Sequence, residues 1–290
     1  LPQQSRLYAS DGTTQIGTFY AQNRIVVPLK KISKPMRQAV VSREDRRFFR
    51  HAGVDIQGVM RAFVATYVKK GATQGGSSLT QQYVKNVLLL QAQEDNDPIA
   101  EYHASEETVA RKLREMLIAV QMEKTYSKLE ILQGYLNIAQ FGRGIYGVEM
   151  AARRYFSTTA DKLDIVQAAT IAAITKNPAA FDPSVESNQK ASQRERNIVL
   201  DLMYQEEYIS QKQRDEAKAK PLKDTLKLQD AQAGCSASGD AAFFCDYVTK
   251  KILNSKEFGK TIEERKKLLY EGGLDIYTTM DVNANSAAMK

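Results

Sequence analysis

Twelve consecutive residues, from Ser42 to Gly53, carry the side chains best suited to chemistry in this 290-residue chain. They include the adjacent carboxylates Glu44 and Asp45, four arginines, two phenylalanines and His51, which is one of two histidines in the whole chain. A positioned carboxylate can take a proton from a hydroxyl group, which is otherwise a poor nucleophile. The alternative is a solvated helix end, because exposed ion pairs are common and stabilise little.

A second group of polar residues follows at 75–86, where two glycines and two serines precede a predicted helix. Ser77 and Ser78 can cap that helix, and its first N–H groups then point outward as an anion site. Lys85 and Asn86 lie a further turn or two along the same helix. The Gly-x4-Gly-Lys-Ser/Thr spacing is absent, so this is not a Walker loop. An ordinary capped helix start is the alternative.

Residues 106–124 predict a further helix with one apolar face. That face is formed by Val109, Leu113, Met116, Leu117 and Val120. Arg111 and Glu115 lie four residues apart on the opposite side, with Lys112 beside them. A plain surface ion pair at this spacing would contribute only about 0.2–0.5 kcal/mol. Ile118 also lies on the charged side, which indicates that this side is not fully exposed.

The elements that must position these groups divide the chain into three parts. Residues 1–34 alternate in short β-prone runs around an Asp-Gly pair, which predicts a hairpin lead-in. Residues 35–220 carry the polar groups and further predicted helices, among them one capped at Ser127 and one that follows a glycine-rich turn around Arg143. Residues 221–290 read as a linker with some β structure that leads toward another domain.

Composition restricts the class of protein. The hydrophobic content of 43% fits a globular protein, and the longest apolar run covers only residues 87–90, too few for a membrane span. The chain starts at Leu1 without a signal sequence, so we expect an N-terminal anchor to lie upstream of it. The net charge of +7 favours an anionic partner. Nucleic acid is not expected, because no DNA- or RNA-binding signature is present.

Two further stretches carry weaker signals. Cys235 and Cys245 lie in a loop rich in glycine, serine and alanine, which can close a disulfide and would place the chain outside the cytoplasm. Two buried free thiols are the alternative. Residues 91–105 are polar and contain His103, and we predict a solvated loop there. The acidic run in it lacks the glycine and the terminal glutamate of a calcium loop.

Taken in chain order, the clusters of polar residues described above resemble the five sequence motifs of the peptidoglycan glycosyltransferase domain (family 51) of class A penicillin-binding proteins. The matching segments are 44–53, 76–86, 111–115, 128–137 and 142–147 onward. Each motif alone is weak, but all five in sequence across residues 35–185 are specific. The chain departs from the family pattern with Ser78 for a usual Thr, Ser157 for a frequent Gly and Gln167 for a frequent Glu.

The resemblance covers only the glycosyltransferase half of such bifunctional proteins. A transpeptidase needs a Ser-x-x-Lys motif together with Ser-x-Asn and Lys-Thr-Gly motifs. Residues 187–190 fit the first by spelling, without companions. We therefore expect no penicillin binding by this chain.

The resemblance implies a mainly α, lysozyme-like fold with two lobes, lying against the outer face of the bacterial cell membrane. It implies polymerisation of lipid II into β-1,4 glycan strands with inversion and release of undecaprenyl pyrophosphate. The expected partners are lipid II, the growing glycan strand, the membrane surface and other proteins of cell-wall synthesis.

The residues agree with this chemistry. Glu44 is the expected general base, while cations and N–H donors meet the charge that develops on the pyrophosphate. Glu115 is assigned to the catalytic group, either as a ligand of a divalent cation (Mg²⁺ or Mn²⁺) on the pyrophosphate or as a residue that positions Arg111. The residues expected to bind substrate are Asp45, Phe48, His51, Ser77, Ser78, Thr80, Gln82, Lys85, Asn86, Arg111, Lys112 and Arg143.

Two other functions remain open at this point. A lysozyme-like glycan hydrolase would use Glu44 as general acid, but its neutral substrate gives no reason for so many cations. A non-catalytic basic module that docks on the cell envelope would not depend on Glu44 at all.

Overall fold

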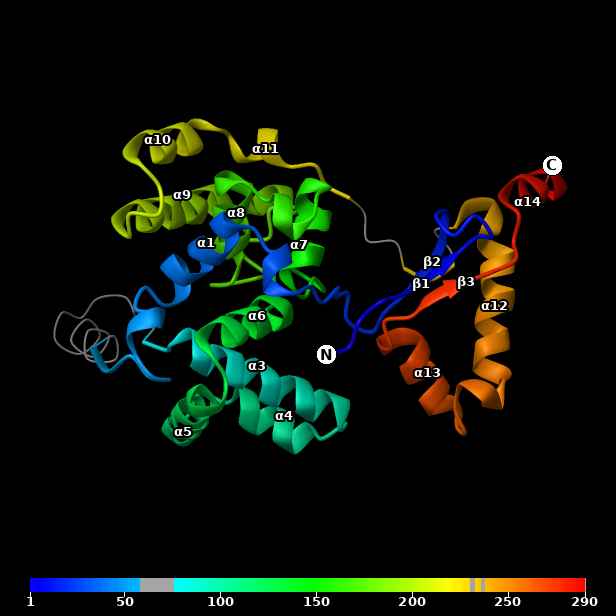
Figure 1. Cartoon of the computed structure of the whole chain (residues 1–290), viewed down its shortest axis with the longest axis horizontal. Helices are drawn as coiled ribbons and strands as arrows, with labels where there is room; N and C mark the ends of the chain where they lie inside the picture. The colour runs from blue at the N-terminus through cyan, green and yellow to red at the C-terminus, as the bar shows by residue number, and fades with distance from the viewer. Residues whose placement is uncertain (58–75, 230–232, 236–237, 290) are drawn as a thin grey trace.

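The computed structural model describes residues 1–57, 76–229, 233–235 and 238–289 (Figure 1). Buried side chains gather in two hydrophobic cores. The larger core contains residues between 32 and 217, and the smaller joins residues near the two ends of the chain. The predicted mainly α fold is confirmed, with a single small sheet among the described elements.

We call the parts of the chain built on these two cores the large unit and the small unit. The first group of helices in the large unit comprises α1 (Lys34–Glu44), α8 (Ile165–Ile174) and α9 (Gln189–Gln205). The side chain of Ser33 caps α1 by accepting from the N–H of Met36. Both α1 and α9 pack on α8, which is buried over most of its length and rich in alanine. Its small side chains let the two neighbours approach closely, and this contact fixes the end of α1, where Glu44 lies.

The second group comprises α3 (Leu79–Glu94), α4 (Pro98–Ser105), α5 (Val109–Thr125) and α6 (Lys128–Ile138). In Figure 1, α3, α4 and α5 lie below α6, and the first group lies above it. Capping boxes start two of these helices: Ser78 pairs with Gln81 before α3, and Ser127 pairs with Glu130 before α6. The predicted starts at Ser78 and Ser127 are thus confirmed. The spacing of Val59, Phe63 and Tyr67 in the sequence also predicts a helix over 56–70, and this range lies largely outside the described residues.

The loop predicted at 91–105 is wrong. The α3 helix continues to Glu94, and α4 begins after a short turn. Asp97 accepts hydrogen bonds from the N–H groups of Ile99 and Ala100, and Pro98 occupies the first turn of α4. The acidic run therefore forms the end of α3 and an exposed turn whose last residue, Asp97, caps α4.

The two faces of α5 are reversed relative to the usual rule for surface helices. Val109, Leu113 and Leu117 are 77%, 56% and 73% exposed, whereas Arg111 and Glu115 are almost completely buried. Gly53, at φ +78°, lies against the backbone of α5 where any side chain would collide with it. The charged side of α5 therefore faces the protein interior, and the apolar stripe faces outward.

The larger unit is completed by three helices and a turn. Residues 141–147 lead into α7 (Val148–Phe156), and α10 (Gln211–Ala219) and α11 (Leu222–Thr225) follow α9. Ser157, after α7, has a left-handed conformation with φ +48°, which explains why glycine suits this position. Among the described residues, no helix combines the length and the apolar character needed to cross a membrane.

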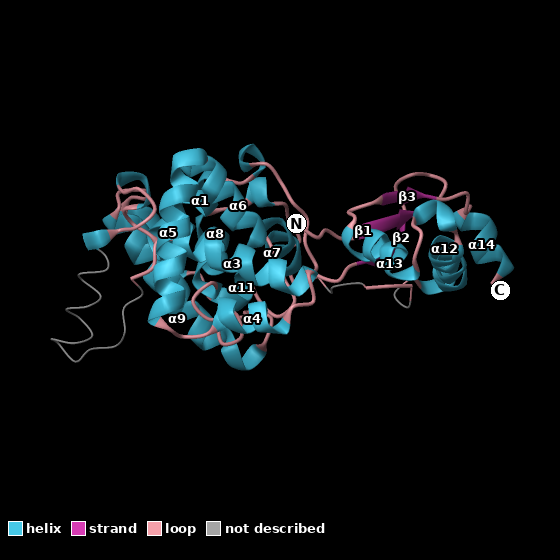
Figure 2. Ribbon diagram, turned by 90° about the horizontal axis from the view of Figure 1, so that it is seen from below, coloured by secondary structure: helices cyan, strands magenta, loops and turns pink. Residues whose placement is uncertain are grey.

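The small unit joins both ends of the chain. In its sheet, β1 (Ser5–Tyr8) pairs antiparallel with β2 (Gln15–Phe19) and parallel with β3 (Asp275–Tyr277). Figure 2 shows this sheet beside α12 (Ala242–Asn254) and α13 (Ile262–Glu271), and α14 (Val282–Ala288) ends the described chain. The expected lead-in hairpin and linker thus share one sheet.

A disulfide bond joins Cys235 and Cys245 in this small unit. Cys245 is completely buried in the smaller core. Gly17 on β2 leaves room for it, since a Cβ at this position would lie 2.8 Å from the Cys245 sulfur. The disulfide therefore ties α12 to the loop that precedes it, directly against the sheet.

Candidate active site

A cavity of about 730 Å³ opens between the two groups of helices. It is lined by residues from α1, α3, α5 and α6, from the segment before α3, and from the segments that follow α6 and α8. They are Arg43, Glu44, Ser77, Gln82, Lys85, Asn86, Lys112, Tyr135, Ala139, Gln140, Thr175, Lys176 and Pro178. Six predicted site residues meet here: Glu44, Ser77, Gln82, Lys85, Asn86 and Lys112.

Glu44, the last residue of α1, is held by donors on both carboxylate oxygens. Oε2 accepts a hydrogen bond from Gln82 Nε2 at 2.7 Å, and Oε1 is hydrogen-bonded to the hydroxyl of Thr175. The hydroxyl of Tyr135 in turn reaches Gln82 Oε1 at 3.3 Å. Burial, and then the charge of Glu44, raises the pKa of Tyr135 well above its usual range, so this side chain remains a neutral phenol. The carboxylate is therefore fixed in orientation at the cavity wall.

Asp45 points away from the cavity. Its Oδ2 lies 2.8 Å from His51 Nε2 and accepts a hydrogen bond from the N–H of Leu79 at 3.0 Å. Phe48 is fully buried in the same loop, with Lys128 Nζ 4.4 Å from its ring centre. These contacts fasten the loop after α1 to the start of α3. Asp45, Phe48 and His51 were predicted to bind substrate, and none of them lines the cavity.

Ser77 and Ser78 have different surroundings. Ser77 accepts a hydrogen bond from Lys112 Nζ at 2.6 Å at the cavity wall. Ser78 caps α3 and donates to the carbonyl of Gly53 at 2.5 Å. The hydroxyl of Thr80 bonds the buried Glu123 instead of facing the cavity. Ser78 and Thr80 therefore act on the framework that presents Ser77.

A cluster of cations lies on the side of the cavity formed by α3 and α5. Burial, and then the charge of Arg111, lowers the pKa of Lys85. Arg111 donates to Glu115 Oε1, and Lys112 Nζ lies 3.6 Å from Glu115 Oε2. The three cations Lys85, Arg111 and Lys112 outnumber the two carboxylates near them, Glu115 and Glu107, so the cluster keeps a net positive charge. Such a site favours a group on which negative charge develops.

The donor set does not form a cage for a metal ion. The two oxygens of Glu115 face Arg111 and Lys112. Within the described part of the chain, no group of three or more His, Cys, Asp or Glu side chains is arranged to hold a metal. Mg²⁺ is commonly held by one or two carboxylates together with substrate phosphates, and Glu115 alone could supply only one such ligand.

Arg143 lies outside the cavity lining. It is exposed in the turn before α7, and its backbone N–H donates to Asp182 Oδ2 at 3.3 Å. Gly142 has φ +134° in this turn, and a side chain at this position would collide with the hydroxyl of Tyr155. The structure therefore does not bring Arg143 together with Glu44.

Sequence reasoning missed a second ionic cluster beside Glu44. Arg43 Nη2 lies 3.1 Å from Glu195 Oε2, and Lys176 Nζ lies 2.8 Å from Glu195 Oε1. Arg43 is the neighbour of Glu44, and Lys176 follows Thr175 in the chain. Glu195 is 152 residues from Arg43. No local pattern connects residues this far apart, so only the folded chain shows the cluster.

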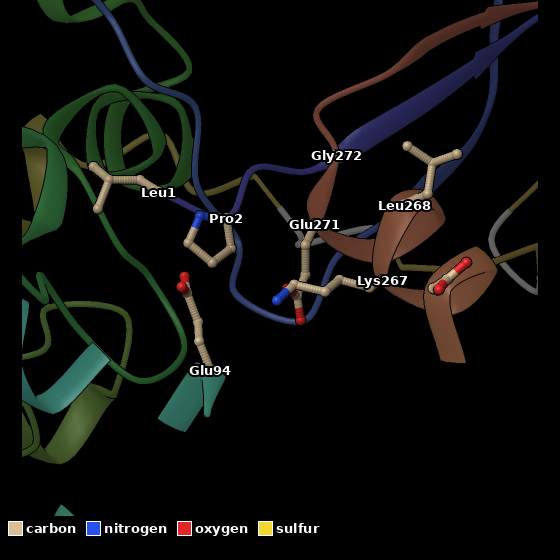
Figure 3. A pocket seen from close by; sticks show the side chains of 8 residues that line it. Leu1, Pro2, Glu94, Lys267, Leu268, Glu271 and Gly272 are labelled. Carbon is tan, nitrogen blue, oxygen red and sulfur yellow. The ribbon is translucent and has the colours of Figure 1, made fainter. Parts of the chain in front are cut away.

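A second pocket, of about 410 Å³, has different chemistry. It is lined by Leu1, Pro2, Glu94, Glu264, Lys267, Leu268, Glu271 and Gly272. Figure 3 shows Glu94 on one side, with Lys267 and Glu271 on the ribbon of α13 across the opening. Three glutamates against one lysine do not suit an anionic substrate. The catalytic candidates therefore belong to the cavity around Glu44.

The family model described as Transglycosylase matches residues 12–204. The chain belongs to this family. The matched range includes every residue that lines the cavity around Glu44. The transglycosylase domain therefore contains the complete candidate site, including the Arg43–Glu195–Lys176 cluster.

Relatives of this transglycosylase domain are penicillin-binding proteins. Penicillin-binding protein 1A of Aquifex aeolicus is 35% identical over 289 residues, which cover 100% of this chain and 35% of that protein. Penicillin-binding protein 2D of Bacillus subtilis is 34% identical over 97% of this chain and 37% of its own length. The chain thus spans about a third of the length of these relatives.

A crystal structure of penicillin-binding protein 1A from Haemophilus influenzae is also similar. It aligns with 99% of this chain and 28% of its own chain, with a TM-score of 0.48 and 20% identity.

Proposed function

We propose that this domain polymerises lipid II into β-1,4 glycan strands, with inversion at the anomeric carbon and release of undecaprenyl pyrophosphate. One observation carries the proposal: a single cavity is lined both by a carboxylate that is fixed on both oxygens and by members of a cluster of cations. Glu44 lies on the wall formed by α1, and Lys85 and Lys112 lie on α3 and α5.

In the proposed reaction, Glu44 takes the proton of the 4-hydroxyl of the acceptor N-acetylglucosamine. That oxygen forms a bond to the donor anomeric carbon as the bond from this carbon to the pyrophosphate oxygen breaks. The leaving oxygen departs with the electron pair, and its charge meets Lys85 and Lys112. Attack from the side opposite the leaving group inverts the anomeric centre.

Arg111 and Glu115 act from behind this cluster. Arg111 is 6% exposed and Glu115 is 2% exposed, so neither reaches far into solvent. The ion pair with Glu115 holds the guanidinium of Arg111 next to Lys85. The positive charge of Arg111 there favours an anion in the cavity. We assign Glu115 to positioning Arg111. The divalent cation expected from the sequence stays a prediction, and no step above depends on it.

We also propose that the outer face of α5 contacts the membrane surface on the extracytoplasmic side. Its three most exposed apolar residues, Val109, Leu113 and Leu117, form one stripe along the helix. Apolar residues flanked by lysines also predict membrane contact by residues 56–90, but part of that region lies outside the described residues, and Leu90 at its end is buried. Exposed apolar patches of this kind mark interaction surfaces.

The cavity offers little support for a hydrolase. Among the described residues that line it, Glu44 is the only acid. Most glycoside hydrolases use a pair of carboxylates that flank the scissile bond. Glu115, the other acid considered at the sequence level, is paired with Arg111 behind the lining.

The reaction is tested by supplying labelled lipid II with Mg²⁺ or Mn²⁺ and, separately, preformed glycan. We expect a ladder of polymer from lipid II with the wild type and with Glu94→Gln, a control in the second pocket, but none with Glu44→Gln. Shortening of preformed glycan without polymer would replace the proposal with a hydrolase. Absence of both reactions, with retained binding to anionic envelope material, would replace it with a docking module.

A further inference from the structure

The hydroxyl of Thr175 faces two acceptors at once. Oγ1 lies 2.7 Å from the carbonyl oxygen of Ala172 and is also hydrogen-bonded to Glu44 Oε1. A threonine hydroxyl carries one proton and two lone pairs. It can therefore donate fully to only one of these oxygens, and the state of Glu44 decides which one.

The two protonation states of Glu44 make opposite demands. An ionised carboxylate only accepts hydrogen bonds, so Thr175 donates to it. A protonated carboxyl carries an O–H that needs an acceptor, and Thr175 Oγ1 can accept from it while donating to the carbonyl of Ala172. Gln82 cannot make this exchange through Nε2, because an amide nitrogen only donates.

We propose that Thr175 is a positioning residue that serves both protonation states of Glu44, donating to the carboxylate before the proton transfer and accepting from the carboxyl after it. The proposal rests on the proposed role of Glu44 as general base. No new bond to substrate is involved. The proton moves from the acceptor hydroxyl to Glu44, and the Thr175 proton turns from Glu44 Oε1 to the carbonyl of Ala172.

The surroundings keep this hydroxyl in place. Thr175 follows directly after α8, and the last residues of this helix, from Ala168 to Ile174, are completely buried. Lys176 is tied to Glu195, which also holds Arg43. The residues adjacent in sequence to Thr175 and to Glu44 are thus joined through one carboxylate on α9, so the two side chains cannot easily separate.

Thr170 supplies a matched control on the same helix. It is completely buried, and its hydroxyl donates to the carbonyl of Val166 at 2.8 Å. Thr170→Val therefore removes a comparable bond from a hydroxyl to a helix carbonyl without touching Glu44. Thr175→Ser keeps the hydroxyl, and Thr175→Val removes it at nearly constant volume.

The kinetic test compares these variants in lipid II polymerisation. We expect Thr175→Val to lower kcat about tenfold, as for loss of a hydrogen bond to a charged group, and to leave KM within about twofold. Both Thr175→Ser and Thr170→Val should have a kcat within about threefold of that of the wild type. An unchanged kcat in Thr175→Val, a loss confined to KM, or an equal loss in Thr175→Ser would overturn the proposal.

The two failures are distinguishable. If the wild type polymerises lipid II, Glu44→Gln does not, and Thr175→Val matches the wild type in kcat and KM, only the role of Thr175 is wrong. If Glu44→Gln polymerises lipid II as the wild type does, the proposed function of Glu44 fails, and with it the exchange assigned to Thr175.

Discussion

Asp45 Oδ2 accepts a hydrogen bond from the backbone N–H of Leu79 at 3.0 Å, although 34 residues separate the two. The same oxygen lies 2.8 Å from His51 Nε2. A carboxylate at the N-terminus of α3 is favoured by the helix dipole. The acidic pair at the end of α1 is thus divided: Glu44 faces the cavity, and Asp45 fastens the wall behind it.

Asp45→Ala should destabilise the fold. It leaves His51 and the N–H of Leu79 buried without this acceptor, which we expect to lower the free energy of unfolding by ~3 kcal/mol. Urea unfolding measures this. Asp246→Ala, which breaks an exposed pair with Lys250, should cost less than about 1 kcal/mol. Equal effects of the two substitutions would contradict the structural role of Asp45.

Lys85 should set the alkaline limit of substrate binding. Burial and the charge of Arg111 lower its pKa, so Lys85 loses its proton at a lower pH than an ordinary lysine does. KM for lipid II should therefore rise on the alkaline side, and Lys85→Arg, which stays charged, should move that rise to higher pH. Lys212→Arg, at an exposed position on α10, is the control. An identical alkaline rise in Lys85→Arg and the wild type would contradict the prediction.

Glu115→Gln separates the two roles first considered for this residue. As a partner of Arg111, its loss should lower kcat on the order of 10²-fold at every Mg²⁺ concentration. As a metal ligand, its loss should instead raise the Mg²⁺ concentration needed for half-maximal rate. Turnover measured across a Mg²⁺ titration decides between them, and a clear shift of that midpoint would contradict the assignment made from the structure.

The outer face of α5 should govern membrane contact. Replacing Leu113 and Leu117 by serine should reduce co-sedimentation with liposomes severalfold, because the apolar area available for burial in the membrane is lost. Ile198→Ser, at an exposed apolar position on α9, should not. Unchanged co-sedimentation of the double variant would show that another surface makes the contact.

Local chemistry was enough to predict the helix starts near the site. Ser78 and Ser127 cap their helices through residues three positions away, so the signal lies within a few residues of sequence. Three of the predicted residues that line the cavity, Gln82, Lys85 and Asn86, lie within the first eight residues of the helix that Ser78 caps.

Tertiary contacts decided what the sequence left open. Periodicity showed two faces of α5 but not which one is buried, because Arg111 and Glu115 turn inward against the usual preference of charged residues for solvent. The contact of Thr175 with Glu44 spans 131 residues and has no local signature. Asp45 was expected to bind substrate, but its Oδ2 accepts a hydrogen bond from the backbone N–H of Leu79, on a helix that is distant in sequence.

The most direct test of the central claim separates binding from chemistry at Glu44. Single-turnover rates and the Kd for lipid II are measured for the wild type and for Glu44→Gln. If Glu44 is the general base, Glu44→Gln should bind lipid II within about threefold of the wild type and react about 10²–10⁴-fold more slowly. A single-turnover rate within a few-fold of the wild type would show that another group takes the proton.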